Sequence, residues 1–197
     1  MRNEELGARF RYKWGMRKSF FLVAVTFLVG CGAPYKWIAH AEPNPFVRPG
    51  CRAVVEPIHS DRLLVGSLPE PAYLQQKKAE SADSYENDKR MSDAEFHQKI
   101  FNDHGSLFLP GTPDNTFVIR PIWTHWEPGF YAFAAAQPAV ADLIVEIHSP
   151  NGQLLDSIAI ETKASDYSSG GRMKLALRQA GRAVSRYISD NWVCAAQ

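Results

Sequence analysis

The 197-residue sequence has few cysteines, no long apolar run and, over most of its length, no excess of positive charge. Its three cysteines, Cys31, Cys51 and Cys194, are too far apart for a zinc or C-x-x-C redox site, so no metal and no cofactor is expected. Residues 1–30 hold six of the 22 Lys and Arg residues and two of the 21 acidic ones. The remaining chain, with 16 basic and 19 acidic residues, is formally −3, which argues against nucleic-acid binding.

The motifs of the common hydrolases are also missing. The sequence contains no H-E-x-x-H, G-x-S-x-G or S-x-x-K pattern, so no nucleophile with an oriented base can be named. What the sequence does have is 45% apolar and 22% charged residues. Those are ordinary globular proportions and predict one compact domain.

A basic segment followed by a short apolar run stands near the beginning of the sequence. Lys and Arg at positions 13, 17 and 18 precede the run FFLVAVTFLVG at residues 20–30, the order found in secretory signal peptides. A membrane-spanning helix needs about 20 apolar residues, and this run is much shorter. We therefore predict a signal peptide over residues 1–30. Met16 also opens a typical signal peptide, so residues 1–15 are either part of the signal peptide or a misassigned start, and the chain starts at Met1 or at Met16.

The apolar run ends in Leu28-Val29-Gly30-Cys31, which resembles the lipobox of bacterial lipoproteins. The resemblance implies cleavage between Gly30 and Cys31 and a diacylglycerol thioether on Cys31. Two or three acyl chains give stable anchoring, whereas a single chain binds only marginally. Because Gly32 rather than Asp follows the cysteine, the resemblance also implies the outer membrane, with the protein facing the periplasm. The alternative is a plain signal peptide cleaved near residues 39–41, which would remove Cys31.

The chain after Cys31 divides into a tether and a domain. Residues 31–52 are rich in proline and have little periodicity, which predicts an extended tether. Residues 53–197 are expected to form a single periplasmic domain. Within it, residues 75–90 are almost wholly polar and predict a solvated loop or disordered insertion, with at most a weak helix.

Local patterns predict the elements of this domain. Ser92 and Glu95 fit a capping box, and Asn151-Gly152 stands between two alternating apolar runs, as in a β-hairpin. The expected elements are a strand at residues 62–67, a helix at 92–105, a strand at 116–126 with Pro121 at an edge or bulge, a hairpin at 140–162 and an amphipathic helix at 172–190. They predict an α+β fold, a small mainly antiparallel sheet with a C-terminal β-hairpin followed by an amphipathic helix packed on one face. The last 80 or so residues loosely resemble small α/β domains of envelope lipoproteins and secretion-assembly factors, a resemblance that carries no functional residue across.

Three groups of residues are candidates for structural or binding roles. Cys51 and Cys194 would face an oxidising periplasm, where a disulfide between them would close a long loop. Trp123 and Trp126 belong either to a partner-binding patch or to the core. A row of basic residues at i, i+4 spacing, called here the basic row, is a candidate contact for an anion or partner, or simply a solvated helix face. The basic row consists of Lys174, Arg178, Arg182 and Arg186.

These observations predict that the chain is a non-enzymatic envelope lipoprotein, which binds a protein or cell-wall partner in an assembly or structural role. One alternative is a cell-envelope enzyme that uses His125, Glu127 or His148 as acid or base. A second alternative is a purely structural anchor.

Overall fold

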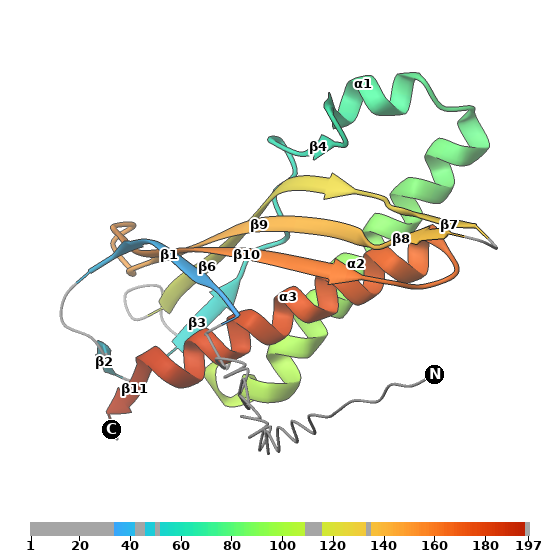
Figure 1. Ribbon diagram of the computed structural model, residues 1–197. Helices are drawn as coiled ribbons and strands as arrows, with labels where there is room; N and C mark the ends of the chain where they lie inside the picture. The colour runs from blue at the N-terminus through green and yellow to red at the C-terminus, as the bar shows by residue number, and fades with distance from the viewer. Residues whose placement is uncertain (1–33, 42–45, 50–51, 109–115, 133–134, 196–197) are drawn as a thin grey trace, which may run out of the picture. The chain divides into compact units, whose positions relative to one another are not determined.

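The computed structural model describes residues 34–41, 46–49, 52–108, 116–132 and 135–195. They form a two-layer α+β unit in which helices α2 and α3 lie side by side on one face of a mainly antiparallel sheet (Figure 1). The predicted fold class is confirmed. The elements are β1 (Lys36–His40), β2 (Phe46–Pro49), β3 (Arg52–Val55), β4 (Leu64–Val65), β5 (Leu68–Pro69), α1 (Glu70–Gln75), α2 (Ala79–His104), a 3-10 helix η1 (Gly105–Phe108), β6 (Thr116–Glu127), β7 (Phe130–Ala132), β8 (Ala135–Gln137), β9 (Ala139–His148), β10 (Leu154–Ala164), α3 (Ser169–Asn191) and β11 (Trp192–Ala195).

The main sheet has the strand order β1-β10-β9-β6-β4-β5, and β3 also pairs with β6. The β9–β10 pair is the predicted hairpin, turning through Gly152 at a positive φ of 84°. Every second residue of β9 is buried, from Ala139 to Ile147, so one face of the sheet points into the core. The helix predicted at residues 172–190 is α3, and the Ser168 side chain caps it by accepting a hydrogen bond from the Gly171 amide at 2.9 Å.

Helix α2 is longer than predicted, because residues 79–90 of the polar segment at 75–90 form its first half. That segment is neither loop nor insertion. It lacks an apolar face but makes tertiary contacts: Tyr85 donates to buried Glu70 at 2.9 Å, and Lys89 forms a 2.8 Å ion pair with the same carboxylate. Ser92 lies inside the helix and donates to the Asp88 carbonyl at 2.6 Å, so the predicted capping box is also wrong.

Helices α2 and α3 cross closely at Gly181. A Cβ atom at this position would lie 2.8 Å from the backbone oxygen of Phe96, too near for any other residue without a shift of the helices. Phe96 and Ile100 of α2 and Leu177 and Val184 of α3 are buried around this crossing. Both helices therefore contribute to one core with the sheet.

The described residues of the predicted tether at 31–52 include two strands, β1 and β2, and are not a simple extended linker. Strand β1 pairs antiparallel with β10, and the buried Asp156 holds its end: the carboxylate accepts from His40 Nδ1 at 2.9 Å and from the Ala41 amide at 3.2 Å. The other Asp156 oxygen accepts from the Tyr187 hydroxyl of α3. The prolines that suggested a tether flank β1, while the pairing depends on a strand more than 100 residues later.

Two further strand predictions need correction. The run at residues 62–67 is a two-residue strand, β4, followed by a turn into β5. Strand β6 corresponds to the predicted strand at residues 116–126, but the prediction that Pro121 marks an edge strand or a bulge is wrong. β6 is an inner strand, and Pro121 lies between the stretches paired with β3 and with β4, where its missing N–H interrupts neither pairing.

Candidate functional site: the open face of the sheet

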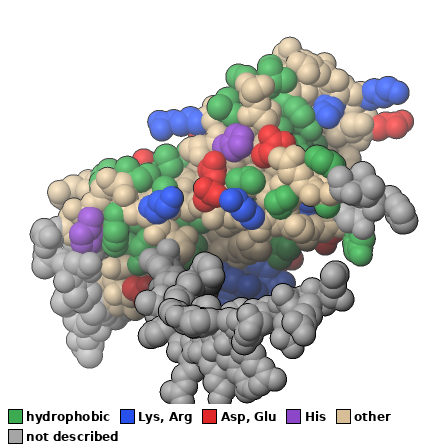
Figure 2. Space-filling view, viewed as in Figure 1, with side chains coloured by type: hydrophobic (Ala, Val, Ile, Leu, Met, Phe, Trp, Pro, Cys, Tyr) green, Lys and Arg blue, Asp and Glu red, His purple; other side chains and the backbone are tan. Residues whose placement is uncertain are grey.

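The sheet face away from α2 and α3 carries alternating charged and apolar side chains. Because side chains alternate along a strand, the residues between the core positions all project from this face. No described helix packs over it, and most of its side chains are partly exposed. The set, called here the open face, is Val118, Arg120, Ile122, His125 and Glu127 of β6, Val140, Asp142, Ile144, Glu146 and His148 of β9, and Ala159, Glu161 and Lys163 of β10. Figure 2 shows charged, histidine and apolar side chains interspersed over the strands.

Charged groups at one end of the open face are held in pairs. Arg120 donates from Nε to Glu56 Oε2 at 2.6 Å, and His59 Nε2 lies 3.1 Å from the same oxygen. The hydrogen bond from Arg120 holds the pKa of Glu56 below its usual range, so the carboxylate stays ionised. Farther along, His148 Nε2 lies 3.0 Å from Glu146 Oε2. This end presents fixed charges of both signs.

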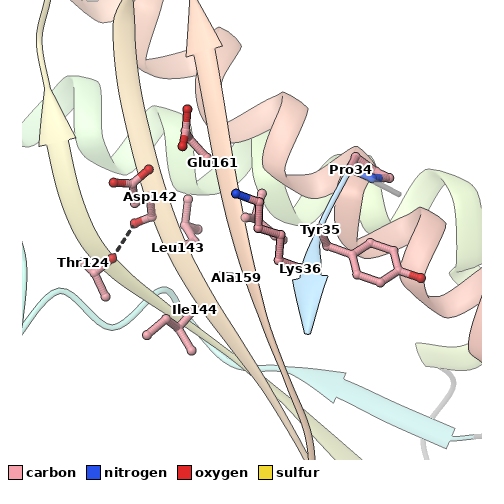
Figure 3. A pocket seen from close by; sticks show the side chains of 10 residues that line it. Pro34, Tyr35, Lys36, Thr124, Asp142, Leu143, Ile144, Ala159 and Glu161 are labelled. Carbon is pink, nitrogen blue, oxygen red and sulfur yellow. Dashed lines mark hydrogen bonds between the residues drawn. The ribbon is translucent and has the colours of Figure 1, made fainter. Parts of the chain in front are cut away.

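A groove of about 450 Å³ lies at the other end, where β1 meets β10. Figure 3 shows Lys36, Asp142 and Glu161 around it, with Tyr35 pointing away toward α3. Its floor is apolar, formed in part by Ile144 and Ala159. Beside it, His125 Nδ1 lies 3.3 Å from the Asp142 carboxylate. The groove thus combines an apolar floor with charged walls, as binding sites commonly do.

The residues proposed for an enzyme do not come together. His125 of β6 is paired with Asp142 of β9, and His148 lies six residues beyond Asp142 along β9. Because a strand rises about 3.3 Å per residue, the two histidines are about 20 Å apart. Glu127 pairs with Val140, still farther from His148. In the described part of the chain, no three His, Cys, Asp or Glu side chains cluster as metal ligands. A joint acid–base site of His125, Glu127 and His148 is therefore not formed.

Trp123 and Trp126 belong to the core. Both have 0% exposed surface, and their rings pack edge to face with centroids 5.9 Å apart. Neither can contact a partner of the folded domain, so the interpretation of these two residues as a binding patch is wrong. A bulge in β6 between Trp123 and His125 lets both tryptophans face inward although they are three residues apart.

The basic row lies where the sequence predicted it, on the outer side of α3. Arg178, Arg182 and Arg186 are exposed, and Lys174 is partly exposed. Cys31 and Cys51 lie outside the described residues, and of Cys194 only the backbone is described, paired with Arg48 in the short parallel β2–β11 sheet. The predicted disulfide therefore stays a prediction.

The sequence pattern did not single out the charged residues of the open face. Asp142, Glu146 and Glu161 alternate with apolar residues in the predicted hairpin, which indicates a polar outer face. Their partners could not be inferred, because Glu56 and Arg120 are 64 residues apart and Lys36 belongs to β1, in the segment whose prolines predict a tether.

Asp93 of α2, away from the open face, is a second carboxylic acid whose pKa is shifted, in the opposite direction from that of Glu56. Asp93 Oδ1 is buried without a hydrogen-bond partner in the described structure, and burial raises the pKa of Asp93 to about 6, against 3.8 for an exposed Asp. Between these pH values the folded state binds more protons than the unfolded state, so this group makes the free energy of unfolding fall as pH rises from about 4 to 6.

We therefore expect Asp93→Asn to stabilise the protein at pH 7, by roughly 1–2 kcal/mol, and to have little effect at pH 4. Urea denaturation of the variant and the unaltered protein at the two pH values measures the difference. Asp83→Asn, at an exposed position of the same helix, is the control and should change neither value. Equal stabilisation by Asp93→Asn at both pH values would contradict the assignment.

Comparison with known proteins gives only distant structural similarity. No protein-family model and no curated protein matches the sequence. Among solved structures, the fold is similar to a PelC dodecamer variant from Paraburkholderia phytofirmans, at 11% identity and a TM-score of 0.42, over 77% of this chain and 94% of that one. A second PelC dodecamer structure from the same organism matches at 9% identity and a TM-score of 0.41, with the same coverage. No helix in the described part of the chain is long and apolar enough to cross a membrane.

Proposed function

We propose that this chain is a non-enzymatic lipoprotein of the bacterial cell envelope, anchored through a lipid on Cys31, which binds a partner on the open face of its sheet. The observation that carries the binding role is the uncovered sheet face, with its groove and its paired charges. The anchoring role is supported by the lipobox-like sequence and by the position of β1 in the sheet.

The position of β1 favours cleavage at Cys31 over the plain signal peptide. Described structure begins at Pro34, and β1 occupies Lys36–His40. Cleavage near residues 39–41 would remove β1, uncover the edge of β10 and take away the contacts that His40 and Ala41 make with Asp156. Cleavage before Cys31 leaves the whole sheet intact.

The charges of the open face favour recognition. Arg120, Glu56 and Glu146 are held in fixed positions by one another and by histidines, and such an arrangement of both signs selects a partner with the complementary pattern. Ile144 and the exposed Leu64 add apolar area between the charges. We therefore favour a folded protein as the partner over a cell-wall polymer, which has no comparable fixed pattern of charge.

Site-specific photo-crosslinking in intact cells tests this role. A photo-reactive residue at position 144, in the groove, is expected to give one discrete crosslinked species, while the same residue at the exposed Gln98 of α2 gives none. Glu161→Lys, at the groove wall, should reduce the crosslink at least tenfold, because it reverses the charge presented to the partner. A purely structural anchor predicts no discrete crosslink from position 144, and that result would overturn the binding role.

A further inference from the structure

The outer side of α3 presents positive charge without matching carboxylates. Among the described residues, only Arg186 of the basic row forms an ion pair, with Asp190 at 2.8 Å, and Arg186 is still 65% exposed. Helix α3 contains five Lys or Arg residues and one Asp. The fifth, Arg172, is buried and donates to the Pro128 and Asp166 carbonyls, so the exposed charge is that of the row.

The row turns around the helix toward the edge strand. Four residues make slightly more than one turn, so each basic residue is displaced by about 40° from the one before it. Lys174 is on the side of α3 that carries Gly181, where α2 packs, and Arg186 is about 120° farther around the helix, near Tyr35. Asp103 of α2 lies near Ser185, but its carboxylate is already paired with Lys99 at 2.6 Å. From Lys174 to Arg186 the row is about 18 Å long.

The row ends where the chain arrives from Cys31. Tyr35 packs against Tyr187 with ring centroids 5.7 Å apart and accepts a hydrogen bond from Asn191 at 2.9 Å. Burial raises the pKa of Tyr35, and the nearby positive charge of Arg186 partly opposes that rise. Pro34 precedes Tyr35, and Cys31 is three residues before Pro34. Three peptide units reach at most about 11 Å.

A lipid on Cys31 would therefore hold the bilayer surface within about 11 Å of Pro34, beside the Arg186 end of the row. We propose that Lys174, Arg178, Arg182 and Arg186 contact anionic phospholipid headgroups and so orient the domain on the membrane that anchors it. This proposal rests on the proposed lipidation of Cys31. A 22-residue tether would leave the row free to lie far from the bilayer, whereas a three-residue connection keeps its Arg186 end near the membrane surface.

The number of basic residues sets the expected strength of the membrane contact and its dependence on salt. Each Lys or Arg at an anionic membrane surface favours the bound state about fivefold. The three arginines together should favour the membrane-facing orientation about 100-fold, and about 1 M salt should remove most of this preference, because the Debye length falls to about 3 Å.

Trp37 provides the reporter. It is 40% exposed and its ring lies 5.6 Å from that of Tyr187, whereas Trp123, Trp126 and Trp192 are buried. The protein is purified from membranes with its native N-terminus and reconstituted into vesicles that carry a headgroup-linked fluorescence quencher. One vesicle set contains phosphatidylcholine alone, and the other also contains phosphatidylglycerol.

We expect Trp37 to be quenched at least twofold more in the phosphatidylglycerol vesicles, and the difference to disappear in about 1 M NaCl. Arg178→Glu, Arg182→Glu and Arg186→Glu, combined, should abolish the difference. The matched control combines Lys77→Glu, Lys78→Glu and Arg90→Glu, an equal charge change at exposed positions of the α1–α2 junction and of α2 itself, and should preserve it. The salt series with the unaltered protein needs no variant and stands even if the triple variant fails to fold.

Quenching that is equal in both vesicle sets, or that the control abolishes as completely as the row variant, would overturn the membrane contact. The N-terminal mass measured on the same sample tests the anchor separately. An acylated Cys31 with no effect of phosphatidylglycerol defeats this proposal and leaves the proposed function. An unmodified Cys31 with an effect that depends on the row defeats the anchor and leaves the contact.

Discussion

Replacement of Cys31 by alanine is expected to abolish acylation of the protein and to leave residues 1–30 attached. The thiol is the atom that would carry the diacylglycerol thioether, and no other side chain at that position can form it. Each buried CH₂ of an acyl chain contributes about 0.8 kcal/mol, so the loss of two or three chains removes the dominant attachment to the membrane. Labelling of cells with radioactive palmitate and the intact mass of the protein measure both effects.

Cys51→Ala is the matched control for this experiment. It changes the same residue type 20 positions later, beyond the lipobox-like sequence, and should leave acylation and processing unchanged. Label that persists in Cys31→Ala, or that disappears in Cys51→Ala, would show that the acyl group is carried elsewhere and would contradict the assignment.

Replacement of Asp156 by alanine is expected to destabilise the protein by about 3–5 kcal/mol. The carboxylate is fully buried and serves three donors, on His40, Ala41 and Tyr187, and each would be left without its acceptor. Urea denaturation measures the loss. Because two of the donors belong to β1 and its end, hydrogen exchange of the β1 amides should also become faster.

Asp142→Ala makes the same substitution on the open face, where the Asp142 side chain is 41% exposed and close to His125. Exposed pairs of this kind contribute at most about 1 kcal/mol, so the variant should be nearly as stable as the unaltered protein. Equal effects of the two substitutions would show that the Asp156 contacts do not hold β1 in place.

The elements that could be predicted from the sequence are those specified by local patterns. The β9–β10 hairpin has strict alternation around Asn151-Gly152, and α3 has a continuous apolar face with a Ser168 cap. The exposed row on α3 follows from the same periodicity. These patterns are complete within about 25 residues, so no distant contact was needed to identify them.

The features that could not be predicted depend on distant contacts. The first half of α2 has no apolar face, and its packing comes from Tyr85 and Lys89 binding Glu70. Strand β1 lies in a proline-rich region and is defined by β10 and by Asp156, 116 residues after His40. The groove and the charge pairs of the open face bring together residues from several strands. Nothing near any one of these residues in the sequence indicates its partner.

The most direct test of this account is the mass of the N-terminal peptide of the native protein purified from membranes. We predict a peptide that begins at Cys31 and carries two or three acyl chains, with residues 1–30 absent. A peptide that begins near residue 40, or one that contains Cys31 unmodified, or one that still carries the apolar run at residues 20–30, would contradict the lipid anchor.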